Sequence, residues 1–223
     1  MQIVSFLHAV FKQVRSFIAP YFCAYCRHFV KDDVVLCDRC LARLRPIVSM
    51  PFRITKKREL IVFAISDYEY PLRALVQAKQ YDNRYAGRQL GRLLWEQTPL
   101  RQVPFDIIVP IPLHWTKYAW RGFNQAEEMA RVLAQKSGKP LVKLIERQKK
   151  TVLQAGLSKT QRVENLDAGF CLSGDAYRYQ GLSILFVDDV MTTGSTLFAA
   201  SKAVALLRPK NLFASVACRV IGR

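Results

Sequence analysis

Two hydrophobic periods divide most of the chain into expected strands and helices. Short apolar runs that end at turn residues predict buried strands, and longer stretches with apolar residues three and four positions apart predict helices. The predicted strands cover residues 60–70, 105–113, 141–145, 183–190 and 211–221. The predicted helices cover residues 71–83, 86–97, 123–140, 157–166 and 195–209. Because strands alternate with helices, the pattern predicts an α/β domain with a mainly parallel sheet.

The first 20 residues predict an amphipathic helix. Its apolar positions recur at helical spacing and are Ile3, Leu7, Val10, Phe11, Val14 and Phe17. Lys12 and Arg15 interrupt the stretch, and no early positive region precedes it, so it does not resemble a signal peptide. We expect it to pack against the protein, with contact to a membrane surface as the alternative. No apolar run approaches the ~20 residues that span a bilayer, so we expect a cytoplasmic protein without a transmembrane segment.

Four of the six cysteines fall in the short segment CAYCRHFVKDDVVLCDRC. Cys23 and Cys26 form one Cys-x-x-Cys pair, and Cys37 and Cys40 form a second. Four thiolates suit tetrahedral Zn²⁺ and predict a structural zinc module. A thioredoxin-like redox pair and disulfides are the alternatives, which two such close pairs without a secretory signal disfavour. His28 is a further candidate ligand that four thiolates make unnecessary.

Changes in composition divide the chain into four expected segments. They are the helix at 1–20, the zinc module at 21–45, a basic linker at 46–59 and the α/β domain at 60–223. The zinc module has almost no hydrophobic core, so metal binding would supply much of its folding free energy. Cys171 and Cys218 lie in apolar, strand-like contexts of the α/β domain, and we expect them to be buried core thiols.

The chain is strongly basic. It has 34 Lys and Arg residues against 17 Asp and Glu residues, which gives a formal net charge of +17. A field of this sign concentrates polyanions, phosphorylated metabolites or acidic lipid surfaces near the protein. A basic surface without a dedicated partner is the alternative, because the cations are spread along the whole chain.

Two adjacent acids follow the clearest predicted strand. The segment ILFVDDVMTTGSTL places Asp188 and Asp189 where this strand ends, before a loop rich in hydroxyl groups. Parallel sheets bind ligands at the carboxyl ends of their strands, where loops lead into helices. Hydroxyl groups, a glycine and the free N–H groups of a helix start therefore predict a phosphate-binding cup. Its loop residues are Met191, Thr192, Thr193, Gly194, Ser195 and Thr196.

The two acids define the rest of the ligand. A carboxylate repels phosphate, but it accepts hydrogen bonds from ribose hydroxyls or binds a Mg²⁺ that accompanies pyrophosphate. A molecule with a phosphate, a ribose and a pyrophosphate is phosphoribosyl pyrophosphate (PRPP). The segment 184–197 thus resembles the PRPP-binding fingerprint of type I phosphoribosyltransferases. This resemblance implies their fold, with PRPP and Mg²⁺ as ligands.

Further segments resemble the ComF-type competence proteins in particular. VPIPLHWTKYAWRGFNQAEEMA resembles their Pro-x-Pro-Leu loop followed by Arg-Gly-Phe-Asn-Gln, and LVQAKQYDNR resembles their Lys-x-Tyr element. KKTVLQAGLSKTQRVENL resembles their Thr-x-x-Gln segment, and the double Cys-x-x-Cys is also their arrangement. The resemblance extends from Cys23 to Val220. It implies a role in natural transformation, with single-stranded DNA handled in the cytoplasm and a competence helicase or recombination protein as partner.

The resemblance also implies a position and a role for the basic loop at 110–122. In a phosphoribosyltransferase this loop lies where pyrophosphate binds, so Lys117 and Arg121 would neutralise that group; the alternative is that they face solvent. Aromatic residues are interspersed with these cations, namely Trp115, Tyr118, Trp120 and Phe123. Such a pattern is typical of a groove for single-stranded DNA. It is also typical of core packing, which is the simpler expectation for most of these rings.

Two functions agree with these features. The first is a competence factor that handles incoming single-stranded DNA and binds PRPP or a related nucleotide. The alternative is an active phosphoribosyltransferase that transfers phosphoribosyl from PRPP to an unknown acceptor. A third option is a regulator that binds PRPP without turnover. The sequence identifies neither an acceptor pocket nor a catalytic residue.

Overall fold

The computed structural model describes residues 21–30, 35–45, 47–55, 58–77, 84–113, 122–147 and 169–220. The chain divides into two units, residues 1–44 and residues 45–223. The helices predicted at 1–20 and 157–166 lie outside the described residues.

The first unit contains a short hairpin and one helical turn. β1 (Tyr21–Phe22) pairs antiparallel with β2 (Phe29–Val30), and α2 (Asp38–Leu41) follows. The buried side chains described in this unit are Cys23, Val30, Val35, Leu36, Cys40 and Leu44. A core of this size provides little hydrophobic free energy, so a unit of this kind depends on a further stabilising interaction such as a bound metal.

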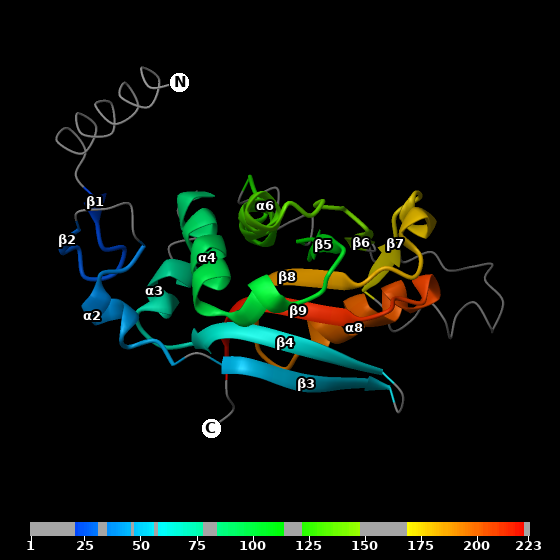
Figure 1. The fold of residues 1–223 in the computed structure, drawn as a ribbon, viewed down its shortest axis with the longest axis horizontal. Helices are drawn as coiled ribbons and strands as arrows, with labels where there is room; N and C mark the ends of the chain where they lie inside the picture. The colour runs from blue at the N-terminus through cyan, green and yellow to red at the C-terminus, as the bar shows by residue number, and fades with distance from the viewer. Residues whose placement is uncertain are drawn as a thin grey trace, which may run out of the picture. The chain divides into compact units, whose positions relative to one another are not determined.

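Five described strands of the second unit form one mixed sheet in the order β3-β4-β9-β8-β5 (Figure 1). β3 (Ile47–Thr55) pairs antiparallel with β4 (Arg58–Asp67). The remaining neighbours are parallel pairs made by β4, β9 (Leu212–Arg219), β8 (Ile184–Met191) and β5 (Ile107–Pro110). The prediction of an α/β fold with a mainly parallel sheet is confirmed, and the arrangement is consistent with a phosphoribosyltransferase-like domain.

Helices cover both faces of this sheet. α4 (Arg84–Gln97) and α6 (Gln125–Ser137) pack together over β4, β9, β8 and β5, with the short α3 (Leu72–Gln77) beside α4 (Figure 1). α4 and α6 approach closely, because a Cβ added at Gly91 would lie only 2.9 Å from the carbonyl oxygen of Met129. α8 (Ser195–Val204) joins the buried core on the opposite face, where it meets alternate residues of the four parallel strands.

Smaller elements complete the described part of the second unit. β6 (Ile145–Arg147) and β7 (Phe170–Leu172) form a separate antiparallel pair. Short 3-10 helices lie at η2 (Pro99–Gln102), η3 (Ala176–Tyr179) and η4 (Ala205–Leu207). Within the described residues, no helix is both long enough and apolar enough to cross a membrane.

The structure confirms the main strand and helix predictions and corrects one segment of the domain scheme. The expected linker at 46–59 is wrong, because residues 47–55 form β3 and residues from Arg58 onward form β4. β3 lies at the edge of the sheet, and edge strands accept prolines and cations such as Pro51 and Arg53 that interior strands exclude. Those residue types are also typical of linkers, which explains the error.

Three further predictions need smaller corrections. The strand expected at 141–145 is reduced to one bridge between Leu141 and Ile108, and β6 begins only at Ile145. The helix expected at 195–209 ends at Val204 and continues as η4. Cys218 is fully buried as predicted, but Cys171 is only partly buried, because it lies on the small β6–β7 pair outside the main sheet.

Candidate functional site

The two acids lie at the carboxyl end of β8, a strand enclosed by β9 and β5. The first four residues of β8 are fully buried, which their apolar side chains permit because helices cover both faces of the sheet. Asp188 and Asp189 follow and are half-buried. This position near the carboxyl end of an interior strand leaves both carboxylates partly exposed and within reach of a ligand.

Asp188 and Asp189 are not equivalent. Successive side chains of a strand point to opposite faces, and the pairing of β8 with β9 stays regular here, with Asp188 opposite Val216. Asp188 therefore shares the α8 face with Phe186, whereas Asp189 leaves β8 on the face covered by α4 and α6. One carboxylate oxygen of Asp188 also accepts a hydrogen bond from the N–H of Asp189 at 2.8 Å, which fixes its orientation.

The hydroxyl loop, residues 192–196, turns the end of β8 into α8. Gly194 is the N-cap of α8 and has a φ of +79°, a left-handed conformation that favours glycine. Thr193 donates its hydroxyl to that of Ser195 at 3.2 Å and accepts the N–H of Ser195 at 3.4 Å. Thr192, Thr193 and Ser195 are exposed. The loop therefore presents hydroxyls beside a helix N-terminus, which is a favourable arrangement for an anion.

Phe52 of β3 bounds this loop from one side. A Cβ added at Gly194 would lie 2.9 Å from two ring carbons of Phe52 and 2.8 Å from the terminal methyl of Met191. Carbon atoms in favourable contact are about 3.5–4.0 Å apart, so a side chain at this position would require the Phe52 ring and the Met191 methyl to move. The backbone conformation favours glycine here, and the close approach of Phe52 adds to that preference.

The ends of the basic loop lie beside β8. The N–H of Ile111 donates to the carbonyl of Val187 at 2.9 Å, so the chain leaves β5 alongside the residue that precedes Asp188. Asn124, the N-cap of α6, donates its side-chain amide to the carbonyl of Ile111 at 2.9 Å. The loop thus begins and ends at the carboxyl end of the sheet, where the two acids also lie. Lys117 and Arg121 lie outside the described residues.

Among the interspersed aromatic residues, Phe123 is the one that the structure describes. Its side chain is 4% exposed, and the guanidinium of Arg84 lies 6.0 Å from its ring centroid. For Phe123, core packing is therefore confirmed. Trp115, Tyr118 and Trp120 lie outside the described residues.

The four cysteines of the first unit converge on one point. The Sγ atoms of Cys23, Cys26, Cys37 and Cys40 all lie within 4.8 Å of one another, and those of Cys26 and Cys37 are 3.6 Å apart. Tetrahedral Zn–S bonds of about 2.3 Å would place the sulfurs about 3.8 Å apart, whereas a disulfide requires about 2.05 Å. The four thiols are free, so the arrangement fits a metal such as zinc and not disulfides.

Backbone hydrogen bonds shape both cysteine pairs. The carbonyl of Cys23 accepts the N–H of Arg27 at 3.0 Å, and Arg27 adopts a φ of +60° to close this turn. The carbonyl of Cys37 accepts the N–H groups of Cys40 and Leu41 at the start of α2. His28 is exposed and does not belong to the sulfur cluster, in agreement with its expected role as a bystander.

The thiols of Cys23 and Cys40 differ in acidity. Burial opposes ionisation of Cys23, but hydrogen bonds from the backbone of Cys37, Cys26 and Tyr25 outweigh it and lower its pKa to about 6. Burial raises the pKa of Cys40, and hydrogen bonds with neighbouring thiols and the negative charge of Cys23 raise it further. A divalent cation at the centre would remove this conflict, because it stabilises all four thiolates and releases their protons.

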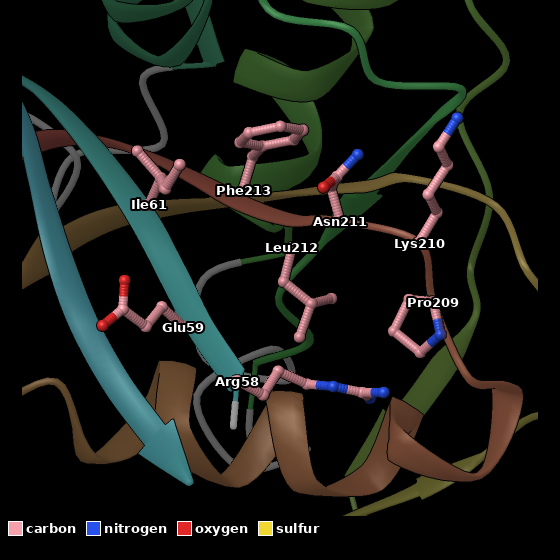
Figure 2. Close-up of a pocket in the computed structure, with 8 residues that line it drawn as sticks. All are labelled: Arg58, Glu59, Ile61, Pro209, Lys210, Asn211, Leu212 and Phe213. Carbon is pink, nitrogen blue, oxygen red and sulfur yellow. The ribbon is translucent and has the colours of Figure 1, made fainter. Parts of the chain in front are cut away.

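A separate hollow lies at the opposite end of the strands of the main sheet, away from the two acids. Its volume is about 400 Å³, and it is lined by Arg58, Glu59, Ile61, Pro209, Lys210, Asn211, Leu212 and Phe213 (Figure 2). These residues start β4 and β9, so the hollow lies at the amino ends of the strands, away from Asp188 and Asp189. Figure 2 shows the Arg58 guanidinium near Pro209 and the Lys210 amine pointing elsewhere, so these two cations do not converge on one anion.

The structure therefore brings together most of the residues predicted for the cup. Asp188, Asp189 and residues 191–196 all lie at the carboxyl end of β8 or directly after it. Two supporting residues were not predicted from the sequence. Phe52 had no signal, because its segment resembles a linker. Asn124 caps α6 and bonds to Ile111, and that bond depends on tertiary structure.

Comparisons with known proteins identify relatives over most of the chain, although no family model matches. Competence protein F of Haemophilus influenzae is 31% identical over 204 residues, which cover 88% of this chain and 82% of the relative. DNA utilization protein YhgH of Salmonella typhimurium is 34% identical over 199 residues, which cover 83% and 84%. Competence protein ComFC of Bacillus subtilis is 32% identical over 98 residues, which cover 44% and 38%. Given these identities and coverages, the chain belongs to the ComF-type family of competence proteins.

Proposed function

We propose that this chain acts in natural transformation or DNA utilisation, where it handles incoming single-stranded DNA in the cytoplasm and binds PRPP or a related nucleotide. The names of its relatives support the DNA-related role. The observation that carries the nucleotide-binding role is the position of Asp188, Asp189 and the hydroxyl loop at the carboxyl end of β8. A domain kept only as a scaffold would need neither both acids nor the full loop.

Each part of the cup has a separate task in this proposal. The hydroxyls and N–H groups of residues 192–196 hold the 5′-phosphate, and Gly194 lets the backbone approach it. Asp188 and Asp189 leave β8 on opposite faces, so they would approach the ribose from two sides across the end of the sheet and accept hydrogen bonds from its hydroxyls. Lys117 and Arg121 neutralise the pyrophosphate, a task for which their loop starts and ends at the correct edge of the sheet. When bound, Mg²⁺ supplies further positive charge to the pyrophosphate.

The net positive charge of the chain supports the proposed binding of single-stranded DNA. A net charge of +17 favours a polyanion over a small neutral ligand. Contacts between cations and phosphates release counterions, so the affinity should fall steeply as salt is added. A competence helicase or a recombination protein is the partner that would deliver or accept the strand.

An active phosphoribosyltransferase remains the second candidate, because a PRPP cup beside a pyrophosphate loop is also the start of an active site. Transfer requires an acceptor next to the ribose. The hollow in Figure 2 lies at the amino edge of the sheet and so offers no acceptor site beside the cup. We place ligand binding ahead of catalysis because the sequence identifies no segment that would bind an acceptor.

Two measurements on one variant test the proposal. Asp188→Ala combined with Asp189→Ala should leave the affinity for single-stranded DNA and its salt dependence nearly unchanged, because carboxylates repel phosphates and are not expected to hold the strand. The same variant should fail to support transformation in cells if ligand binding is part of the function. Wild-type protein that does not bind single-stranded DNA at low salt would contradict the DNA-handling role.

A further inference from the structure

The hairpin of the first unit exposes two aromatic side chains side by side. Phe22 and Phe29 are directly opposite each other in the β1–β2 pairing. Their ring centroids are 6.3 Å apart with an interplanar angle of 80°, which is an edge-to-face contact. Phe22 is 50% exposed and Phe29 is 53% exposed. Together they form what we call the Phe22–Phe29 pair.

The Phe22–Phe29 pair is not part of the unit's own core. Side chains alternate between the two faces of a strand, so Val30 points away from the face that carries Phe29. Val30 is buried, and so is Cys23, which follows Phe22. The hairpin thus directs one face to the small core and the metal ligands, and the other, with two phenyl rings, to the outside. Two phenyl rings exposed side by side form a small apolar patch, which makes this face of the hairpin a candidate binding surface.

The charges near the hairpin bear on what kind of partner this surface fits. Arg27, Arg39, Arg43 and Asp38 have exposed side chains. Residues 21–44 as a whole contain four Lys and Arg residues against three Asp residues, in a chain whose net charge is +17. Arg27 lies in the turn that joins β1 to β2. Exposed rings beside a cation such as Arg27 are a combination that proteins use for single-stranded nucleic acid, since rings stack on unpaired bases and cations hold phosphates.

We propose that the Phe22–Phe29 pair is a stacking site for an unpaired base of single-stranded DNA, with Arg27 beside it for the backbone. This inference rests on the proposed function, because it assumes that the chain binds single-stranded DNA. The rings are nearly perpendicular, so they cannot both stack on parallel bases. One ring stacks on a base and the edge of the other contacts it, which defines a site for a single base. The metal site, whose ligand Cys23 follows Phe22, holds the hairpin in shape.

The test compares two strands that differ only in their bases. One is an oligothymidylate of about 15 nucleotides, within the range of known binding sites, and the other is an abasic strand of the same length. Phe22→Ala combined with Phe29→Ala should weaken binding of oligothymidylate by about 5- to 150-fold, because stacking is lost. The slope of affinity against salt should not change, and neither should the affinity for the abasic strand. Arg27→Ala should instead reduce the salt slope for both strands.

Controls separate stacking from other effects. Tyr177→Ala removes a ring that is 62% exposed on the second unit and should change neither affinity. Phe22→Leu combined with Phe29→Leu keeps apolar volume without the rings, and it should lose binding even if the alanine variant does not fold. The metal content of each variant reports whether the unit is intact. An equal loss on both strands, or no loss in the leucine variant, would overturn the inference while wild-type DNA binding still supports the proposed function. If wild-type protein binds neither strand, both fail.

Discussion

The side-chain amide of Asn124 lies 2.9 Å from the carbonyl oxygen of Ile111 and donates a hydrogen bond to it. The oxygen of the same side chain accepts the N–H of Ala126 at 3.1 Å and caps α6. One residue thereby joins the end of β5 to the start of α6, and these are the two ends of the loop that contains Lys117 and Arg121. We infer that Asn124 sets where this loop begins and ends relative to Asp188.

Asn124→Ala should therefore affect stability and ligand binding together. Loss of the cap costs about 1 kcal/mol, which should lower the melting temperature by about 2–4 °C for a chain of this length. Loss of the bond to Ile111 should also weaken PRPP binding. Asn124→Ser is the matched control, since serine can cap the helix but is too short to reach Ile111. It should restore the contribution of the cap to stability and still bind PRPP more weakly; wild-type affinity in this variant would show that the bond does not position the loop.

Gly194→Ala should destabilise the hydroxyl loop. The left-handed conformation costs a non-glycine residue about 1–2 kcal/mol, and overpacking against Phe52 and Met191 adds about 1–3 kcal/mol. The loop would have to move, so PRPP binding should be lost. Denaturant unfolding and calorimetry measure the two effects.

Gly181→Ala provides the control for Gly194→Ala. Gly181 has a φ of +76°, close to that of Gly194, but an added Cβ would meet no atom within 4 Å. The Gly181 variant should therefore show the conformational cost alone and keep its affinity for PRPP. If both variants lost the same stability, the close contact with Phe52 would be of no consequence.

Removal of one cysteine of the cluster should release the metal and unfold the first unit only. Wild-type protein should contain about one zinc ion per chain. Cys37→Ser should lose it, and amide exchange should become fast across the described residues of the first unit. The second unit has its own core and should keep its fold and its affinity for PRPP.

Cys171→Ser is the matched control for metal binding, because this thiol lies on β7, outside the sulfur cluster. It should retain the full metal content. A Cys37→Ser protein that kept its zinc and its amide protection would contradict the proposed metal centre.

The sequence predicted the acidic end of β8 because that site is built from consecutive residues. A buried strand, two acids, hydroxyls and a glycine follow one another, and the rule that ligands bind at strand carboxyl ends supplies the location. The metal site of the four cysteines could likewise be predicted from the sequence, since their spacing alone indicates a metal. In both cases local sequence and three-dimensional position coincide.

Other parts of the site depend on contacts between distant segments, which no local pattern reports. Phe52 meets Gly194 only because β3 is added to the sheet edge, and the prolines and cations of β3 resemble a linker. The exposure of Phe22 and Phe29 could not be predicted from the sequence, because it depends on the register of a hairpin with two residues in each strand. The different faces of Asp188 and Asp189 likewise follow from the regular pairing of β8 with β9.

Calorimetric titration of the protein with PRPP and Mg²⁺ tests the central claim most directly. We expect saturable binding by the wild-type protein, and its loss in Asp188→Asn combined with Asp189→Asn, which removes both charges at nearly constant shape. Glu59→Gln, at the opposite edge of the sheet, should bind like the wild type. The titration is made at two temperatures, because a binding enthalpy can pass through zero at one of them. Absence of saturable heat from the wild-type protein at both temperatures would contradict the PRPP cup.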